Sequence, residues 1–208
     1  MRTEENETEK PADRGQGNMQ AADAEGSAPE EKQKSGWKRM LREWGVPLAL
    51  ALAAAVFIDS VLVVNARIPS GSMENTVQKG DRIFGSRLAY LNSDPERFDI
   101  IFFRYPDDRS RIFIKRVIGL PGETVTIVDG KVYINDEETP LDDSFIKEEM
   151  LGSFGPYEVP EDCYFVLGDN RNNSKDSRFW ENTFVPKKDI LGEAGLRYWP
   201  LNKIGFLE

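Results

Sequence analysis

One long apolar run constrains this 208-residue chain more than any other feature. The run is rich in Ala and Leu over 46–58, is interrupted by Asp59 and resumes as far as Val64. A helix that crosses a bilayer needs about 20 mostly apolar residues, a length reached only by counting over 44–64. Because the run has no polar stripe at helical spacing, we expect a transmembrane helix rather than a buried helix of a soluble domain. We therefore assign 37–64 to a basic juxtamembrane segment and one membrane span.

The residues that flank this run predict its orientation. The N-terminal side carries four cationic side chains, Lys34, Lys38, Arg39 and Arg42. Positive charge stays on the cytoplasmic side, so we expect a single-pass cell-membrane protein with its C-terminal domain outside the cytoplasm. Asp59 then lies near the outer interface, where a carboxylate reaches water at modest cost. The acidic segment 1–36 lacks Leu, Ile, Val and Phe, so we expect it to be a disordered cytoplasmic tail. A cleaved leader is disfavoured because the apolar run begins deep in the chain, behind this segment.

The rest of the chain, 65–208, is expected to form a mainly β, all-β domain. Short segments rich in β-branched and aromatic residues alternate there with Gly and Pro. The expected strands are 81–84, 99–105, 112–118, 125–128, 132–134 and 163–167. Asp129 and Gly130 predict a two-residue hairpin between two of these strands. The segment 136–160 is interpreted as a long polar excursion from the sheet.

Composition excludes several kinds of function. The formal net charge of −9 argues against nucleic-acid binding, which needs clustered Lys and Arg. The only cysteine, Cys163, cannot form an internal disulfide, and we expect it to be a small buried apolar residue. With no histidine in the chain there is neither a Cys-His pair nor the usual zinc ligand set, so we expect no metal and no cofactor.

A turn directly after the apolar run carries a candidate nucleophile, Ser72. A serine hydroxyl is a weak nucleophile until a base activates it, and the usual base, histidine, is absent. A lysine kept neutral by burial is the realistic replacement. Gly71 would let a substrate backbone approach, and Ser70 offers a hydroxyl to an oxyanion. Pro69 to Ser72 is also ordinary turn composition, so the turn alone leaves both interpretations open.

Lys115 is the candidate base. It lies within the expected strand 112–118, where alternation places it on one face with Phe113 and Val117. An amine on an apolar face has a lowered pKa. The alternative is an edge-strand lysine that blocks aggregation, and the strand alone does not decide between the two. The absence of histidine favours the base.

A polar cluster over 168–178 follows the expected strand 163–167. It has the composition of a plain loop rich in Asp and Asn. Asp176 and Arg178 are also able to pair and hold the loop rigid, while Ser174 is able to orient a buried amine. A metal loop is disfavoured because the Asp-x-Asn-x-Asn-Gly spacing with a closing Glu is not met.

Taken in order, these motifs resemble those of the bacterial type I signal peptidases, membrane-anchored Ser/Lys proteases that cut signal peptides from exported proteins. The segment 68–73, with Thr76, Gly80 and Asp81 after it, is similar to the family's nucleophile box. The segments 99–106, 115–122 and 168–178 are similar to the next boxes, and 192–200 to the closing strand. One box is weak evidence, whereas four in the right order are highly specific.

The resemblance implies a role for each matched residue. Ser72 is the nucleophile and Lys115 the general base, while Ser70 helps the Ser72 backbone amide form the oxyanion hole. The remaining implied roles are lysine orientation by Ser174, support of the site by Asp176 and Arg178, and pockets for small substrate side chains lined by Ile68 and Ile114. The implied substrates are secretory pre-proteins, which are cleaved after small residues at Ala-x-Ala sites through an acyl-enzyme. We expect the enzyme to be a monomer anchored in the lipid bilayer.

Three alternatives stay open from the sequence. A self-cleaving Ser/Lys regulator has a similar dyad, but it carries a DNA-binding module or cleavage segment where this chain has an apolar run. A membrane-anchored β domain that only binds partners would use the serine and lysine as structural residues. A mitochondrial processing peptidase is disfavoured because the acidic N-terminal segment is unlike a transit peptide.

Overall fold

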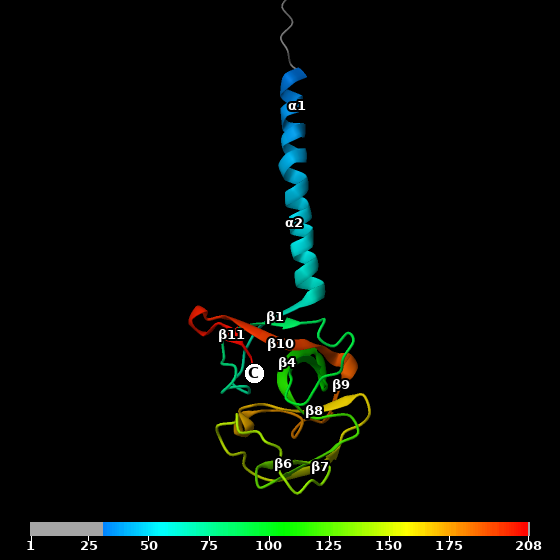
Figure 1. Ribbon diagram of the computed structural model, residues 1–208, viewed down its shortest axis with the longest axis vertical. Coiled ribbons are helices and arrows are strands. Elements are labelled where there is room, and N and C mark those ends of the chain that lie inside the picture. Colours follow the sequence, from blue (N-terminus) through cyan, green and yellow to red (C-terminus); the bar gives the residue numbers. More distant parts are fainter. Residues whose placement is uncertain (1–30, 208) are drawn as a thin grey trace, which may run out of the picture. The chain divides into compact units, whose positions relative to one another are not determined.

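A computed structural model describes residues 31–207, and the expected tail falls largely outside these described residues. A continuous helix opens the described chain (Figure 1). It runs through α1 (Glu31–Met40), the π-helical turn η1 (Leu41–Gly45), α2 (Val46–Phe57) and the π-helical turn η2 (Ile58–Leu62). Its 27-residue part Gly36–Leu62 is long and apolar enough to cross a membrane. None of the α2 side chains is buried, as expected of a helix that packs against lipid rather than protein.

Both ends of the helix differ from the sequence-based expectation. The helix begins at Glu31, within the segment 1–36 that we expected to be disordered, because the residues that follow Glu31 are mostly good helix formers. It ends at Leu62 rather than Val64, because Val63 and Val64 begin strand β1 (Val63–Arg67). Val64 is β-branched and is 4% exposed, so its burial in the β domain overrides the apolar run.

An antiparallel eight-stranded sheet forms most of the β domain. Besides β1, its strands are β2 (Arg82–Ser86), β3 (Ile100–Tyr105), β4 (Asp108–Gly119), β8 (Cys163–Leu167), β9 (Val185–Pro186), β10 (Ile190–Trp199) and β11 (Gly205–Phe206). Their spatial order is β1-β2-β10-β3-β4-β8-β9, and β11 pairs with β10. The expectation of a mainly β domain is confirmed.

A smaller sheet, in the order β6-β5-β7, contains the expected hairpin. Strands β5 (Thr124–Val128) and β6 (Lys131–Ile134) are joined by Asp129 and Gly130, whose φ angles of 44° and 81° are those of a tight primed turn. The third strand, β7 (Phe154–Glu158), lies inside the segment 136–160 and corrects its interpretation as an excursion from the sheet. Its aromatic residues Phe154 and Tyr157 pack against a buried cluster, which the surrounding Gly and Pro conceal in the sequence.

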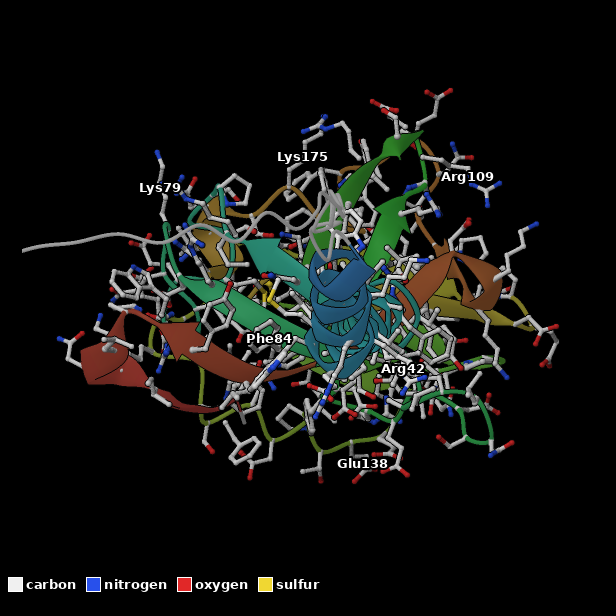
Figure 2. The ribbon with its side chains drawn as sticks, turned by 90° about the horizontal axis from the view of Figure 1, so that it is seen from above. Arg42, Lys79, Phe84, Arg109, Glu138 and Lys175 are labelled. Carbon is white, nitrogen blue, oxygen red and sulfur yellow. The ribbon has the colours of Figure 1, made fainter. Side chains whose placement is uncertain are left out.

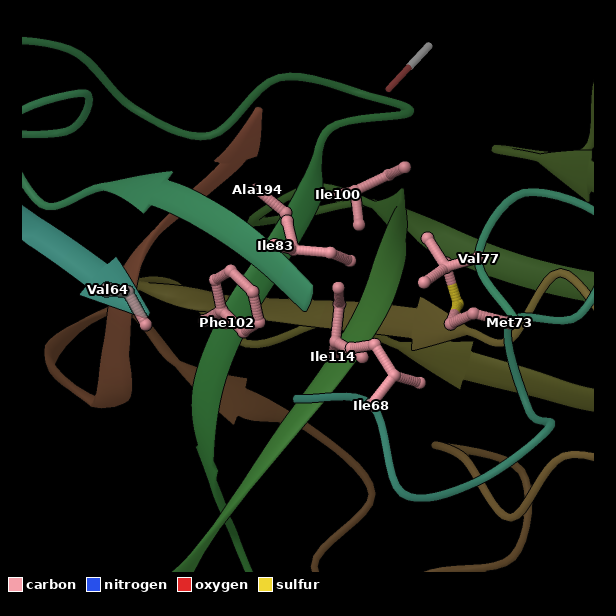
Figure 3. Close-up of a cluster of buried hydrophobic side chains, with 9 residues drawn as sticks. All are labelled: Val64, Ile68, Met73, Val77, Ile83, Ile100, Phe102, Ile114 and Ala194. Atoms are coloured by element: carbon pink, nitrogen blue, oxygen red, sulfur yellow. The ribbon is translucent and has the colours of Figure 1, made fainter. Parts of the chain in front are cut away.

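One of the hydrophobic clusters fixes the turn that follows β1. Figure 3 shows Ile68, Met73 and Val77 from this turn packed with Phe102 of β3 and Ile114 of β4. Met73 and Val77 are fully buried, and Ile68 is 2% exposed. Burying such a side chain contributes roughly 1.5–3 kcal/mol, so the turn that carries Ser72 is anchored on both sides.

Candidate active site

Ser72 and Lys115 are in direct contact, although 43 positions separate them in the sequence. The Nζ atom of Lys115 donates a hydrogen bond to the Oγ atom of Ser72. Ser72 belongs to the turn anchored by Met73, and Lys115 lies in β4 opposite Ile101 of β3. Because the hydrophobic core holds both elements, the contact rests on the packing of the domain.

Burial gives the Lys115 amine the properties of a base. Lys115 is 3% exposed, which contradicts the alternative of an edge lysine that blocks aggregation, because such a lysine must reach solvent. Desolvation lowers the pKa of Lys115 to about 8; the positive charge of Arg178 adds to this, while Asp176 and Asp169 oppose it. With a pKa of about 8, roughly a tenth of the amine is neutral at pH 7.

The loop 168–178 is held by the ion pair expected from the sequence. Arg178 Nε lies 2.8 Å from Asp176 Oδ1 and Arg178 Nη2 lies 2.9 Å from Asp176 Oδ2, with both side chains buried. Asp176 also accepts a hydrogen bond from the Gly168 amide at 3.0 Å. Because charged, bidentate hydrogen bonds in a buried setting are strong and directional, they fix the shape of the loop.

Ser174 differs from the sequence-based expectation. Its side chain is buried and lines the same groove as Lys115, but among the described residues its Oγ has no hydrogen-bond partner. The expected hydrogen bond to the lysine amine is therefore not made. Gly168 makes the tight packing there possible, because a Cβ on Gly168 would stand 2.6 Å from the Ser174 Cβ and closer still to the Ser72 carbonyl oxygen.

Sequence reasoning missed a buried network beside Lys115. Arg116 binds Asp169 through two hydrogen bonds of 2.9 and 2.8 Å, and Asp169 also accepts a hydrogen bond from Thr76. Alternation along β4 turns Arg116 to the face opposite Lys115, so the network forms behind the base rather than in the groove. Arg116 directly follows Lys115 in the sequence, but its partner Asp169 is 53 positions away, so no local pattern joins the two.

An open groove exposes the Ser72–Lys115 contact. Its volume is about 510 Å³, and it is lined by 69–72, Tyr105, 111–115 and 172–175. Ile114 lies in this lining, whereas Ile68 packs in the core beneath it. The Oγ of Ser70 lies 3.5 Å from the Oγ of Ser72. The groove therefore gathers a nucleophile, a base and a second hydroxyl.

A larger cavity, of about 790 Å³, shares no lining residue with this groove. Cys163 lines it and is half-buried rather than fully buried, and burial raises the pKa of its thiol. Among the described residues, no group of His, Cys, Asp and Glu is placed to hold a metal ion.

A serine hydroxyl in contact with a buried lysine amine, in a groove of a β domain that follows an apolar helix, is the arrangement of a membrane-anchored serine hydrolase without histidine. The family model described as "Signal peptidase, peptidase S26" matches residues 41–199. The probable signal peptidase I-2 of Synechocystis sp. is 41% identical over 171 residues, which cover 79% of this chain and 76% of the relative. Signal peptidase I of Leptolyngbya laminosa is 40% identical over 197 residues, which cover 90% and 92% of the two chains.

A crystal structure of a signal peptidase I from Enterococcus faecalis V583 is 36% identical, with a TM-score of 0.42, and the match covers 49% of this chain and 97% of that one. The chain belongs to the signal peptidase family, peptidase S26. It is accordingly a hydrolase, a serine endopeptidase that removes signal peptides. The alternative of a β domain that only binds partners is excluded.

Proposed function

We propose that the chain cleaves secretory pre-proteins after small residues, at Ala-x-Ala sites, with Ser72 as nucleophile and Lys115 as general base. The observation that carries this proposal is the hydrogen bond from Lys115 Nζ to Ser72 Oγ, made by a lysine that is 3% exposed. The pKa of about 8 at Lys115 supports the same assignment, since a base works best when its pKa lies near the working pH.

In the acylation step, Ser72 Oγ attacks the carbonyl carbon of the scissile bond and its proton passes to neutral Lys115. The tetrahedral intermediate collapses as the C–N bond breaks, and Lys115 returns the proton to the leaving amine. The product is an ester between Ser72 and the signal peptide. Water then gives a proton to Lys115 and attacks the ester, which releases the signal peptide as a carboxylic acid and returns the proton to Ser72.

The negative oxygen of each tetrahedral intermediate needs hydrogen-bond donors. We assign this role to the Ser72 amide and the Ser70 hydroxyl, which lies 3.5 Å from Ser72 Oγ. Asp176 and Arg178 hold the loop behind Lys115. Ser174 lines the same groove as Lys115 although its Oγ makes no hydrogen bond there, and we assign it the orientation of the lysine amine.

Substrate binding uses the outer part of β4. This strand pairs with β3 along 112–116, but its pairing with β8 starts only at Arg116, so the second edge of 111–115 is free of any described strand. An extended peptide is able to add to such an edge through main-chain hydrogen bonds. Ile114 then meets the small side chains next to the cleaved bond, with Ile68 packed behind it in the core.

The proposed cellular arrangement follows from the apolar helix. Gly36–Leu62 crosses the cell membrane, with its basic end in the cytoplasm and the β domain outside. The apolar segment of a signal peptide occupies the same bilayer, so tethering raises the effective concentration of enzyme and substrate. We propose that the enzyme works as a monomer, because Ser70, Ser72 and Lys115 of one chain line a single groove.

The cleavage test uses the full chain in detergent or lipid vesicles with a pre-protein whose signal ends in Ala-x-Ala. Wild-type protein is expected to release the mature protein, and N-terminal sequencing is expected to place the cut after the second Ala. Ser72→Ala should give no product while retaining its fold. Cleavage by Ser72→Ala, or a cut elsewhere in the pre-protein, contradicts the proposal.

The single cysteine tests orientation. In intact cells, a membrane-impermeant thiol reagent is expected to label Cys163, which lies in the β domain. A Cys163→Ser protein that also carries Met40→Cys should be labelled only after the membrane is opened, because Met40 lies at the basic end of the helix. Labelling in the reverse order would contradict the proposed topology.

A further inference from the structure

The groove that exposes Ser72 has an unusual balance of charge for this chain. The whole chain carries a formal net charge of −9, yet no Asp or Glu is among the described residues that line the groove. Arg111, Lys115 and Lys175 do line it. Lys115 must be neutral to act as a base, whereas Arg111 and Lys175 are exposed cationic side chains. The groove is therefore a cationic surface on an acidic protein.

Aromatic rings hold Arg111 in place. Its guanidinium carbon lies 5.0 Å from the centre of the Phe113 ring and 5.6 Å from that of Tyr105. These two rings are themselves stacked, with centroids 4.5 Å apart and an angle of 9° between their planes. Trp180 packs against both rings from the buried side. A cation held over rigid rings keeps its place and its charge, and its outer side stays open to a ligand.

The Asp108 carboxylate attracts Arg111, but neither Arg111 nor Lys175 is held by a direct ion pair within the described protein. Neither side chain forms an ion pair or a side-chain hydrogen bond with another described residue. The carboxylates of the neighbouring hairpin, Asp107 and Asp108, do not line the groove, and both accept hydrogen bonds from other residues. Asp107 accepts hydrogen bonds from Tyr105 and Asn182, and Asp108 accepts two from Ser110. A ligand carboxylate in the groove therefore meets two cations with no competing acid in the lining.

The position of Arg111 along β4 indicates which part of the substrate it meets. Arg111 precedes Lys115 by four positions, which in an extended strand is about 13 Å. Ile114 also precedes Lys115 along β4. Under the proposed function it contacts the small substrate side chains that come before the cleaved bond. A substrate strand that continues along this edge brings a residue about four positions further upstream next to Arg111.

Lys175 lines the groove from a different element. It follows Ser174 in the loop 168–178, whereas Arg111 belongs to β4. Figure 2 shows Lys175 on the edge of the domain toward which the hairpin of Arg109 also extends, with Glu138 on the opposite edge. Two separate elements of the domain thus each contribute a cation to the groove.

We propose that Arg111 and Lys175 are specificity-determining residues that favour pre-proteins with a carboxylate about four or five residues before the cleaved bond and disfavour those with a lysine there. This inference rests on the proposed function. It concerns the choice among substrates, not the chemistry at Ser72. An exposed ion pair of this kind changes kcat/KM by about two- to fivefold, and salt screens it.

The test compares three pre-proteins that differ only in the fifth residue before the cleaved bond, which is Glu, Gln or Lys. For wild-type enzyme we expect kcat/KM to fall in the order Glu, Gln, Lys, by about two- to fivefold a step at low salt, and the steps to shrink in 1 M salt. Arg111→Gln should reduce the Glu preference, Arg111→Gln with Lys175→Gln should abolish it, and Arg111→Glu should reverse it.

Arg104→Gln is the matched control, because Arg104 is an exposed arginine on the neighbouring strand β3 and does not line the groove. It should retain the wild-type order. Equal kcat/KM for the three substrates overturns the inference while the proposed function stands, and so does a preference that survives in the double variant. The same preference with the charge moved to the mature side of the bond overturns the upstream placement. Failure of wild-type enzyme to cleave any of the three substrates would instead contradict the proposed function.

Discussion

The backbone carbonyl of Ser72 accepts a hydrogen bond from the backbone amide of Asn170 at 3.1 Å. The Asn170 side chain also donates to the Gly71 carbonyl at 3.2 Å. The turn that carries the nucleophile is thus joined to the loop that carries Ser174 and Asp176. The position of Ser72 relative to Lys115 depends on this joint as well as on the hydrophobic core.

Gly168→Ala tests the joint without replacing a residue that is assigned to the chemistry. The added Cβ would stand 2.6 Å from the Ser174 Cβ and would also collide with the Ser72 carbonyl oxygen, so the two loops must separate. We expect a loss of roughly 1–3 kcal/mol in the free energy of unfolding and a fall in kcat of about 100-fold, since small displacements of reacting groups are costly. Denaturant unfolding and initial cleavage rates measure the two effects.

Gly205→Ala is the control for that substitution. A Cβ at Gly205 meets nothing within 4 Å, and Gly205 lies in β11, which contributes no residue to the groove. It should leave both stability and rate unchanged. A Gly168→Ala enzyme as active as Gly205→Ala would show that the joint does not position Ser72.

The fold was predictable where a pattern is local. The strand 112–118, the Asp129-Gly130 hairpin and the apolar helix each follow from a period or a turn signal within a few residues. β7 was missed because its pairing with β5 depends on contacts across the domain, which override the Gly and Pro in its sequence. The helix end was misplaced because Val63 and Val64 suit a membrane span and a buried strand equally well.

The site was predictable in its residue types more than in its contacts. Ser72, Lys115, Asp176 and Arg178 are brought to one place as expected. The Arg116–Asp169 pair was not foreseen, because two oppositely charged residues 53 positions apart leave no local signal. Ser174 lines the groove with Lys115 as expected, but its Oγ makes no hydrogen bond to the lysine amine, because residue types in a sequence do not determine side-chain contacts.

Lys115→Arg tests the base. The guanidinium keeps the positive charge but does not lose its proton near neutral pH, so it is unable to accept the Ser72 proton. We expect kcat to fall by several orders of magnitude, as is typical when an activating base is removed. Pre-protein cleavage followed over long incubation measures the residual rate. Near wild-type processing by this variant would end the assignment of Lys115 as base.

Ser70→Ala tests the oxyanion donor. The hydroxyl is proposed to donate to charge that develops only in the transition state, so its loss should lower kcat by about 100- to 1,000-fold and leave KM nearly unchanged. Ser70 is exposed, so little change in stability is expected. Ser70→Thr, which keeps a hydroxyl, is expected to restore much of the rate. A rise in KM with unchanged kcat would assign Ser70 to substrate binding instead.

The pH dependence of cleavage follows from the pKa of about 8 at Lys115. Only the neutral amine accepts a proton, so kcat/KM should rise with pH and level off above a pKa of about 8, with about a tenth of the plateau at pH 7. Asp176 raises the pKa of Lys115, so Asp176→Asn should move the rising limb to lower pH, whatever the height of its plateau. If the rising part of the kcat/KM profile stays at the same pH in Asp176→Asn, a group other than Lys115 controls the pH dependence.

The same pKa shift predicts how stability changes with pH. The pKa of Lys115 is about 8 in the folded protein and about 10.4 in an unfolded chain, so the unfolded state binds more protons between these values. The contribution of Lys115 to stability is therefore lowest below pH 8 and increases as pH rises from about 8 to about 10.4. Lys115→Met removes the titrating group and keeps the apolar stem, so its stability should lack this increase. The two proteins are compared by denaturant unfolding at pH 7, 8, 9 and 10, and parallel curves for wild type and Lys115→Met would contradict the lowered pKa.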